Sequence, residues 1–87
     1  MTSIELNIEF TSLGETTETE AKVFAAEVQR RIESEYPDAS VIVGIDFRGF
    51  GGLFVNADSY EEQDLIADRV YSIKDYVWEK GVWHNAS

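Results

Sequence analysis

Five carboxylates in the last third of the chain have the spacing of one face of an α-helix. They are separated by three, four, seven and four residues, and they are Glu61, Asp64, Asp68, Asp75 and Glu79. At about 100° per residue, this spacing places all five within a sector of roughly 60°. No Lys or Arg stands three or four positions from any of them. A row of unneutralised acids suits the recognition of a basic surface, and neighbouring like charges otherwise only destabilise a helix.

The earlier of the two expected helices offers an internal comparison, because its acids are spaced to meet bases. The spaced pairs are Glu18 with Lys22, Glu27 with Arg30 and Arg31, Glu33 with Arg30, and Glu35 with Arg31. In the later helix, Arg69 and Lys74 fall on the flanks of the acidic row and Lys80 falls near the apolar side. The lack of basic neighbours is therefore selective and does not follow from composition alone.

The helix dipole makes the end of the row the hardest part to explain by stability. Glu61 and Asp64 lie near the amino end of the helix, where negative charge is favourable, whereas Asp75 and Glu79 lie near the carboxyl end. Together with the like-charge neighbours, the total penalty is roughly 1 to 3 kcal/mol. The row spans 18 residues, or about 27 Å, and so approximates the anionic track of a nucleic-acid strand. An ordinary solvated face remains the alternative.

Side chains beside the row extend the candidate partner-binding site. Glu62 stands on one flank, and Tyr60, Tyr71 and Trp78 form a column along the other edge. Aromatic rings are good anchors in protein interfaces. Packing at the rim of the core explains these three rings equally well.

Other chemistry finds little support in the sequence. His84 is the sole histidine and lies near the end of the chain, without partners for a triad or a metal site. Asp64 with Asp68 suits at most weak binding of a divalent cation, because no calcium-loop spacing is present. We expect no catalytic residue, no metal site and no cofactor, and hence a protein that is not an enzyme.

Periodicity predicts the elements that must position these side chains. Apolar and polar residues alternate over 4–10, which predicts a strand, and Thr17 with Glu20 forms a capping box before a helical apolar stripe that ends at Pro37. A second alternating strand follows over 41–47. The last helix is expected to begin at Asp58 or Ser59 and to end at Gly81. Its expected apolar stripe is Ile66, Val70, Ile73 and Val77.

The glycine-rich segment between the later strands reads as a turn. Gly49-Phe50-Gly51-Gly52 lacks the Lys-Ser/Thr of a phosphate loop, and residues 53–56 suit the return strand of a hairpin. Phe50 at the tip either contacts a partner or folds onto the core. The predicted fold is α+β, a two-layer sandwich of order β-α-β-β-α with both helices on one face of a three-stranded sheet. The pattern leaves open whether the first strand lies beside the second or the third.

Composition limits the class of protein and of partner. The 87 residues form one domain, residues 1–87, with a formal net charge of −10 and no cysteine. We expect no direct contact with nucleic acid or anionic membranes, because both require a basic surface. The beginning of the chain lacks the features of a signal peptide and no apolar run reaches membrane-spanning length. We therefore expect a cytoplasmic protein that is a monomer or weak dimer and binds basic proteins.

Several short motifs resemble the DinI-like family. They are Glu27-Val28-Gln29-Arg30-Arg31-Ile32, Tyr36-Pro37-Asp38, Val77-Trp78-Glu79 and Trp83, in the same order of elements. The resemblance covers nearly the whole chain and implies a modulator of the RecA filament in the DNA-damage (SOS) response. It also implies that the acidic row, with Glu62, imitates DNA. The Gly-rich segment, Lys74 and Lys80 depart from the family pattern.

The leading hypothesis is a non-enzymatic DNA mimic that modulates RecA. Two alternatives remain: a phage-type inhibitor of another nucleic-acid machine, such as a CRISPR effector, and a homodimeric structural module that pairs through the aromatic column. The direction of the modulation is left open.

Overall fold

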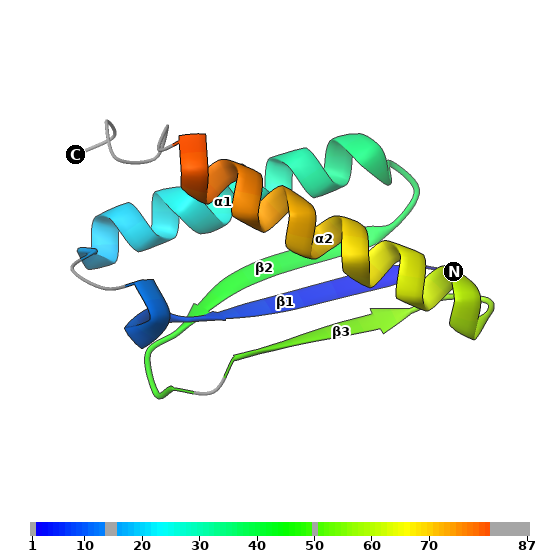
Figure 1. Cartoon of the computed structure of the whole chain (residues 1–87), viewed down its shortest axis with the longest axis horizontal. Helices are drawn as coiled ribbons and strands as arrows, with labels where there is room; N and C mark the ends of the chain where they lie inside the picture. The colour runs from blue at the N-terminus through cyan, green and yellow to red at the C-terminus, as the bar shows by residue number, and fades with distance from the viewer. Residues whose placement is uncertain (1, 14–15, 50, 81–87) are drawn as a thin grey trace.

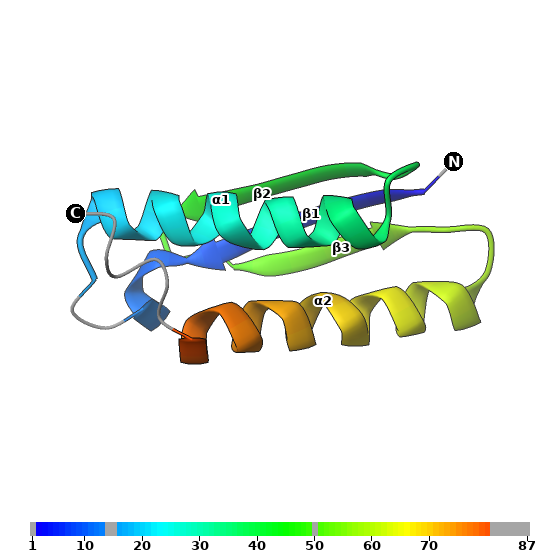
Figure 2. The same ribbon diagram turned by 90° about the horizontal axis from the view of Figure 1, so that it is seen from above.

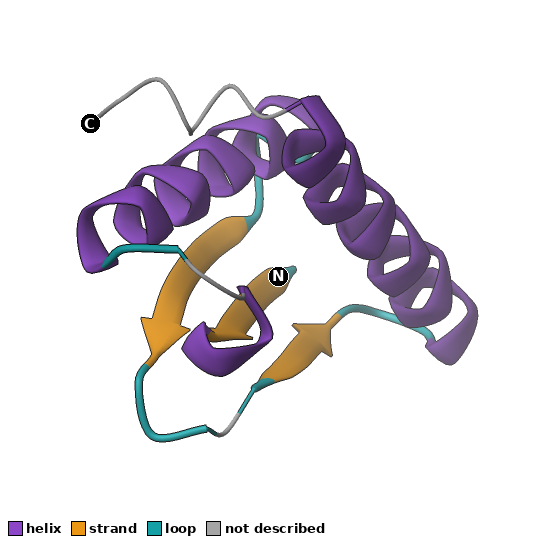
Figure 3. Cartoon of the chain, turned by 60° about the vertical axis from the view of Figure 1, so that its left-hand side comes forward, coloured by secondary structure: helices purple, strands orange, loops and turns teal. Residues whose placement is uncertain are grey.

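The chain folds as two layers, a three-stranded sheet and two helices that cover one of its faces (Figures 1, 2 and 3). The computed structural model describes residues 2–13, 16–49 and 51–80. The elements are β1 (Ser3–Glu9), a short 3-10 helix η1 (Phe10–Leu13), α1 (Glu18–Glu35), β2 (Ser40–Asp46), β3 (Gly52–Asn56) and α2 (Tyr60–Lys80). The expected order β-α-β-β-α and the α+β class are confirmed.

The first strand lies in the middle of the sheet, beside both of the others. The strand order is β2-β1-β3, with β2 parallel to β1 and β3 antiparallel to it. Ile4 is paired with Val41 on one side and with Val55 on the other. The expected hairpin between the later strands is therefore wrong. The prediction paired two strands because they are adjacent in sequence. In the structure β1 forms hydrogen bonds with β2 along one edge and with β3 along the other, and every second residue of β1 is buried.

The Gly-rich segment is a link across the end of β1 and not a hairpin turn. Gly49 has a φ of 89°, a backbone conformation that favours glycine. A Cβ added at Gly51 would lie 3.3 Å from the carbonyl oxygen of Asn7 and 3.3 Å from Cβ of Glu9. A side chain at Gly51 would therefore require β1 or the link to shift by a few tenths of an ångström. Phe50, whose contact was expected in either of two places, lies outside the described residues.

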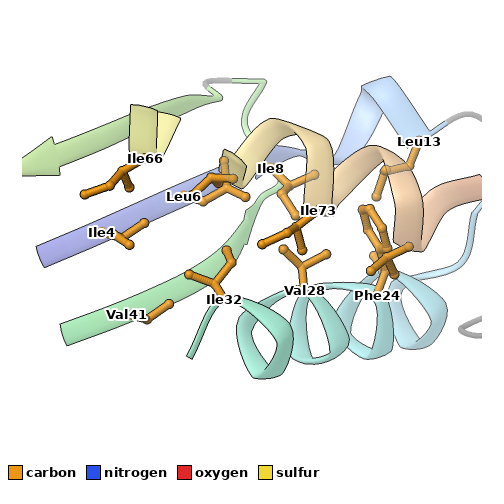
Figure 4. Close-up of a cluster of buried hydrophobic side chains, with 14 residues drawn as sticks. Ile4, Leu6, Ile8, Leu13, Phe24, Val28, Ile32, Val41, Ile66 and Ile73 are labelled. Atoms are coloured by element: carbon orange, nitrogen blue, oxygen red, sulfur yellow. The ribbon is translucent and has the colours of Figure 1, made fainter. Parts of the chain in front are cut away.

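One apolar core joins the two layers (Figure 4). The sheet contributes the residues of β1 that alternate with polar ones, and each helix contributes its predicted stripe. Members of the core are Ile4, Leu6, Ile8, Ala21, Phe24, Ala25, Val28, Ile32, Ile66, Val70, Ile73 and Val77, together with Leu13 and Val41. The period-2 pattern thus predicted the buried face of β1 correctly, and the period-3.6 pattern predicted those of both helices. The alternation expected over 41–47 holds only in part, because Val41 alone is buried and Phe47 lies beyond β2 and is 46% exposed.

Both predicted amino-terminal caps are present. The Thr17 hydroxyl accepts a hydrogen bond from the backbone N–H of Glu20 at 3.1 Å, while the Glu20 carboxylate accepts one from the Thr17 N–H at 3.2 Å. On α2 the cap is Ser59, whose hydroxyl accepts from the backbone N–H of Glu62 at 3.1 Å. The expected helix stop at Gly81 lies outside the described residues. Each cap satisfies an amide that the helix leaves unpaired.

An ion pair between Arg69 and Glu35 connects α2 to α1. The Arg69 Nε donates to the two Glu35 oxygens at 2.7 and 2.9 Å. The expected pairing of Glu35 with Arg31 is wrong, because Glu35 reaches across to α2 while Arg31 lies near Glu27, with Nε 3.3 Å from Oε1, and over the Tyr76 ring. The hydrogen bond from Arg69 lowers the pKa of Glu35.

We expect Arg69→Gln to lower the free energy of unfolding at pH 7 by a small amount, since both groups are well exposed. A depressed carboxyl pKa adds stability above the ordinary value of 4.5 and loses it as the pH falls through the folded pKa. Urea denaturation at pH 7, 5 and 3 should therefore show the gap between wild type and variant closing at the lowest pH. A gap that is constant from pH 7 to 3 would contradict the ion-pair explanation.

Candidate functional site

The outer side of α2 carries the acidic row, here called the acidic face and defined by Glu61, Asp64, Asp68, Asp75 and Glu79. All five side chains are exposed. The helix buries Ile66, Val70, Ile73 and Val77, which lie on the opposite side of the same cylinder. Because the capped helix is continuous from Tyr60 to Lys80, it holds the five carboxylates in line over about 27 Å.

The acids of the acidic face have no basic partner within the described part of the chain. None takes part in an ion pair or a side-chain hydrogen bond there. On α1, by contrast, Glu27 pairs with Arg30 and Arg31, as its spacing predicted. Glu18 and Glu33 form no ion pair with any described residue, so fewer acids of α1 are paired with bases than the spacing predicted. The contrast between the helices still rests on Glu27 and on Glu35.

The row contains one gap. Ser72 stands four residues after Asp68 and three before Asp75, at a position that belongs to the same side of the helix. The gap divides the acidic face into a group of three acids near the amino end of α2 and a group of two near its carboxyl end. Along the axis the two groups are about 10 Å apart.

The residues that flank the acidic face differ in solvent exposure and in their contacts with other side chains. Tyr60 is 85% exposed and Glu62 is also exposed. Tyr71 is half-exposed, and the Lys74 Nζ lies 5.4 Å from the centre of its ring. Trp78 packs edge-on against Phe24, with ring centres 5.6 Å apart, so this ring belongs partly to the rim of the core. The aromatic column is therefore a mixed surface of one free ring and two supported ones.

Sequence reasoning missed two apolar side chains on the other edge of the acidic face. Leu65 is 71% exposed and Tyr76 is 47% exposed. The Tyr76 ring has the Arg31 guanidinium 5.1 Å and the Lys80 Nζ 5.4 Å from its centre. The available signal was that both residues fall outside the apolar stripe of α2, where a side chain has no core to cover.

The described residues contain no cluster of three or more His, Cys, Asp or Glu side chains that could hold a metal ion. His84 and Trp83 lie beyond them. No helix in the described part of the chain is long and apolar enough to cross a membrane. Chemically, the acidic face is thus suited to charge recognition at an open surface.

We expect Asp75→Asn combined with Glu79→Gln to raise the free energy of unfolding by about 0.5 to 1.5 kcal/mol. The pair repels itself at i,i+4 and opposes the dipole at the end of α2. Glu61→Gln with Asp64→Asn is the matched variant, and it should raise stability less because charge there favours the dipole. Thermal and urea denaturation measure both. Equal gains for the two pairs would show that the dipole has no part in the effect.

Comparison with known proteins gives no family assignment: no protein-family model matches the chain, and no curated protein matches its sequence.

Proposed function

We propose that this protein is a non-enzymatic DNA mimic, whose α2 binds the basic groove of a nucleic-acid-binding protein and modulates it. The observation that carries the proposal is the acidic face, five exposed carboxylates on one helix that have no basic partner among the described residues. The residues that resemble the DinI-like family direct the proposal to the RecA filament as the partner.

The charge density of the acidic face supports an imitation of a single strand. Five carboxylates lie over about 27 Å, where one strand of DNA would carry about eight phosphates at 3.4 Å each. A groove that pairs with phosphates through Lys and Arg can accept carboxylates in the same way, because both are oxyanions. We expect the affinity to be lower than for DNA unless other contacts add to it.

Exposed apolar side chains beside the acidic face supply such contacts. Tyr60 and Tyr71 border one edge, and Leu65 borders the other. Burying these side chains adds the area-dependent stabilisation that charge pairs at an exposed surface lack. A homodimer through the same surface is disfavoured, because it would bring two acidic faces together.

The test is binding of the fluorescently labelled protein to purified RecA, without and with single-stranded DNA, followed by anisotropy. A DNA mimic should bind RecA without DNA and should lose binding as single-stranded DNA fills the groove. Binding should weaken at least about 10-fold between 50 and 200 mM salt, because charge pairs are screened. Failure to bind RecA would remove it as the partner. Binding that is unaffected by salt would contradict the acidic face as the contact surface.

Sedimentation of the free protein tests the homodimer. A tight dimer that is lost with changes at Tyr60 and Tyr71 would favour the structural module over the mimic.

A further inference from the structure

A groove of opposite character lies on the seam between α1 and α2. It has a volume of about 530 Å³ and collects every arginine of the chain except Arg48. Its polar lining comes from both helices, with Arg30, Arg31, Ser34 and Glu35 on α1 and Arg69, Ser72 and Tyr76 on α2. Such a concentration of guanidinium groups is unexpected in a protein with a net charge of −10.

The guanidinium groups outnumber the carboxylates that pair with them. Arg30 and Arg31 share Glu27, and Arg69 pairs with Glu35. Three positive charges therefore face two negative ones, and each guanidinium has five N–H donors. An excess of positive charge and of donors remains in the groove.

Arg31 carries the clearest unused donor. Its Nε is buried and makes no hydrogen bond with any residue that the structure describes, although Glu27 Oε1 lies 3.3 Å away. Its guanidinium group is held over the Tyr76 ring at 5.1 Å. A buried polar group without a partner is uncommon and costs free energy, so a ligand that reorders this side chain would gain by satisfying it.

We propose that this groove binds a phosphate group, either free phosphate or the phosphate of a small monoester. Donors stand on two walls, and a tetrahedral anion can accept from both, whereas a planar carboxylate accepts mainly in its own plane. Guanidinium forks also match phosphate oxygens in pairs. The hydroxyls of Ser34, Ser72 and Tyr76 add neutral donors of the kind found at such sites. The proposal goes beyond the function proposed for the acidic face and does not depend on it.

The negative charge of the whole protein limits the affinity of this groove. Asp68 and Asp75 stand about one helical turn from Ser72, which lines the groove, so these two carboxylates oppose a bound anion. At 0.15 M ionic strength the Debye length is about 8 Å, so only the more distant carboxylates are largely screened. We expect a dissociation constant below about 10 mM for inorganic phosphate, enough for saturation in a titration.

The experiment is a nuclear magnetic resonance titration of the full chain at pH 7.5 and constant ionic strength. Its probes are inorganic phosphate, ribose 5-phosphate and acetate. Phosphate should produce saturable shifts of the backbone amides of residues 30–35 and 69–76, and acetate should not. Tighter binding of ribose 5-phosphate than of phosphate would identify a monoester as the ligand, and equal or weaker binding would identify free phosphate.

Three single variants, each of which removes one positive charge, test the site, and Arg48→Gln is the control among them. Arg31→Gln and Arg69→Gln should weaken phosphate binding at least about 5-fold, whereas Arg48→Gln should leave it unchanged. Arg31→Gln keeps the test valid if loss of the Arg69–Glu35 pair perturbs the helices. Shifts that do not saturate, that match those with acetate, or that respond equally to Arg48→Gln would overturn the proposal.

Discussion

Neutralising four carboxylates of the acidic face should weaken binding to the RecA filament at least about 100-fold, or about 2.7 kcal/mol. The changes are Asp64→Asn, Asp68→Asn, Asp75→Asn and Glu79→Gln, which preserve the size of each side chain. Close charge pairs in an interface contribute about 1.5 kcal/mol or more each when they are desolvated. The loss of four leaves Glu61, the flanking Glu62 and the apolar border to hold the partner. Anisotropy at 50 mM salt measures the change.

A second four-acid variant separates the effect of the acidic face on binding from the effect of the protein's net charge. Glu5→Gln, Glu18→Gln, Glu33→Gln and Asp38→Asn change exposed acids on β1, on α1 and in the turn after it. This control reaches the same net charge as the first variant, and it should retain binding within about threefold. A similar loss in both variants would show that bulk charge, and not the arrangement on α2, attracts the partner.

The stability of the first four-acid variant shows whether a loss of binding comes from the missing charges or from misfolding. All five residues of the acidic face are exposed, so its neutralisation should leave the unfolding midpoint unchanged or raise it. If the variant binds weakly and also melts at a lower temperature, misfolding would explain the result instead. Circular dichroism and thermal denaturation of the same samples make this distinction.

Local periodicity predicted most of the fold. Alternation marked β1, and i,i+3/i+4 spacing marked the buried stripes of both helices, because these patterns record which side of each element faces the core. The caps at Thr17 and Ser59 were also visible, since a cap uses residues a few positions apart. The same property made the acidic face predictable as an exposed row.

Contacts between distant segments were not predictable in this way. The place of β1 between β2 and β3 depends on which edges each strand completes, and sequence adjacency suggested a hairpin instead. The pairing of Glu35 with Arg69, and not with Arg31, depends on how the helices lie against each other. Proximity along a helix is a weak guide when a partner on another helix offers better geometry.

The groove between the helices was not predictable for the same reason, because its residues come from distant segments of the chain. Arg30 and Arg31 are adjacent in sequence, but Arg69 joins them only in the folded chain. By spacing along the chain, Arg30 and Arg31 are expected to neutralise nearby acids, and Arg69 flanks the acidic face. Their excess over the paired carboxylates becomes apparent only when the two helices are placed together.

Phe24→Ala should have the largest effect on stability, about 3 to 5 kcal/mol, because it opens a cavity in the core. Phe24 is 1% exposed, and its ring also meets Trp78 edge-on at 5.6 Å, which connects α1 to α2. Domains of this size have total stabilities of roughly 4 to 13 kcal/mol, so the variant loses a large part of the whole. Urea denaturation should show a lower midpoint, and the melting temperature should fall by more than about 12 °C.

Phe54→Ala provides the same chemical change at an exposed position. Phe54 is 64% exposed on β3. Its removal should lower the free energy of unfolding by less than about 1 kcal/mol, because little buried area is lost. A cost for Phe24→Ala as small as that for Phe54→Ala would mean that α1 and α2 do not share this part of the core. In that case the packing of α1 against α2 would not be what holds the acidic face in place.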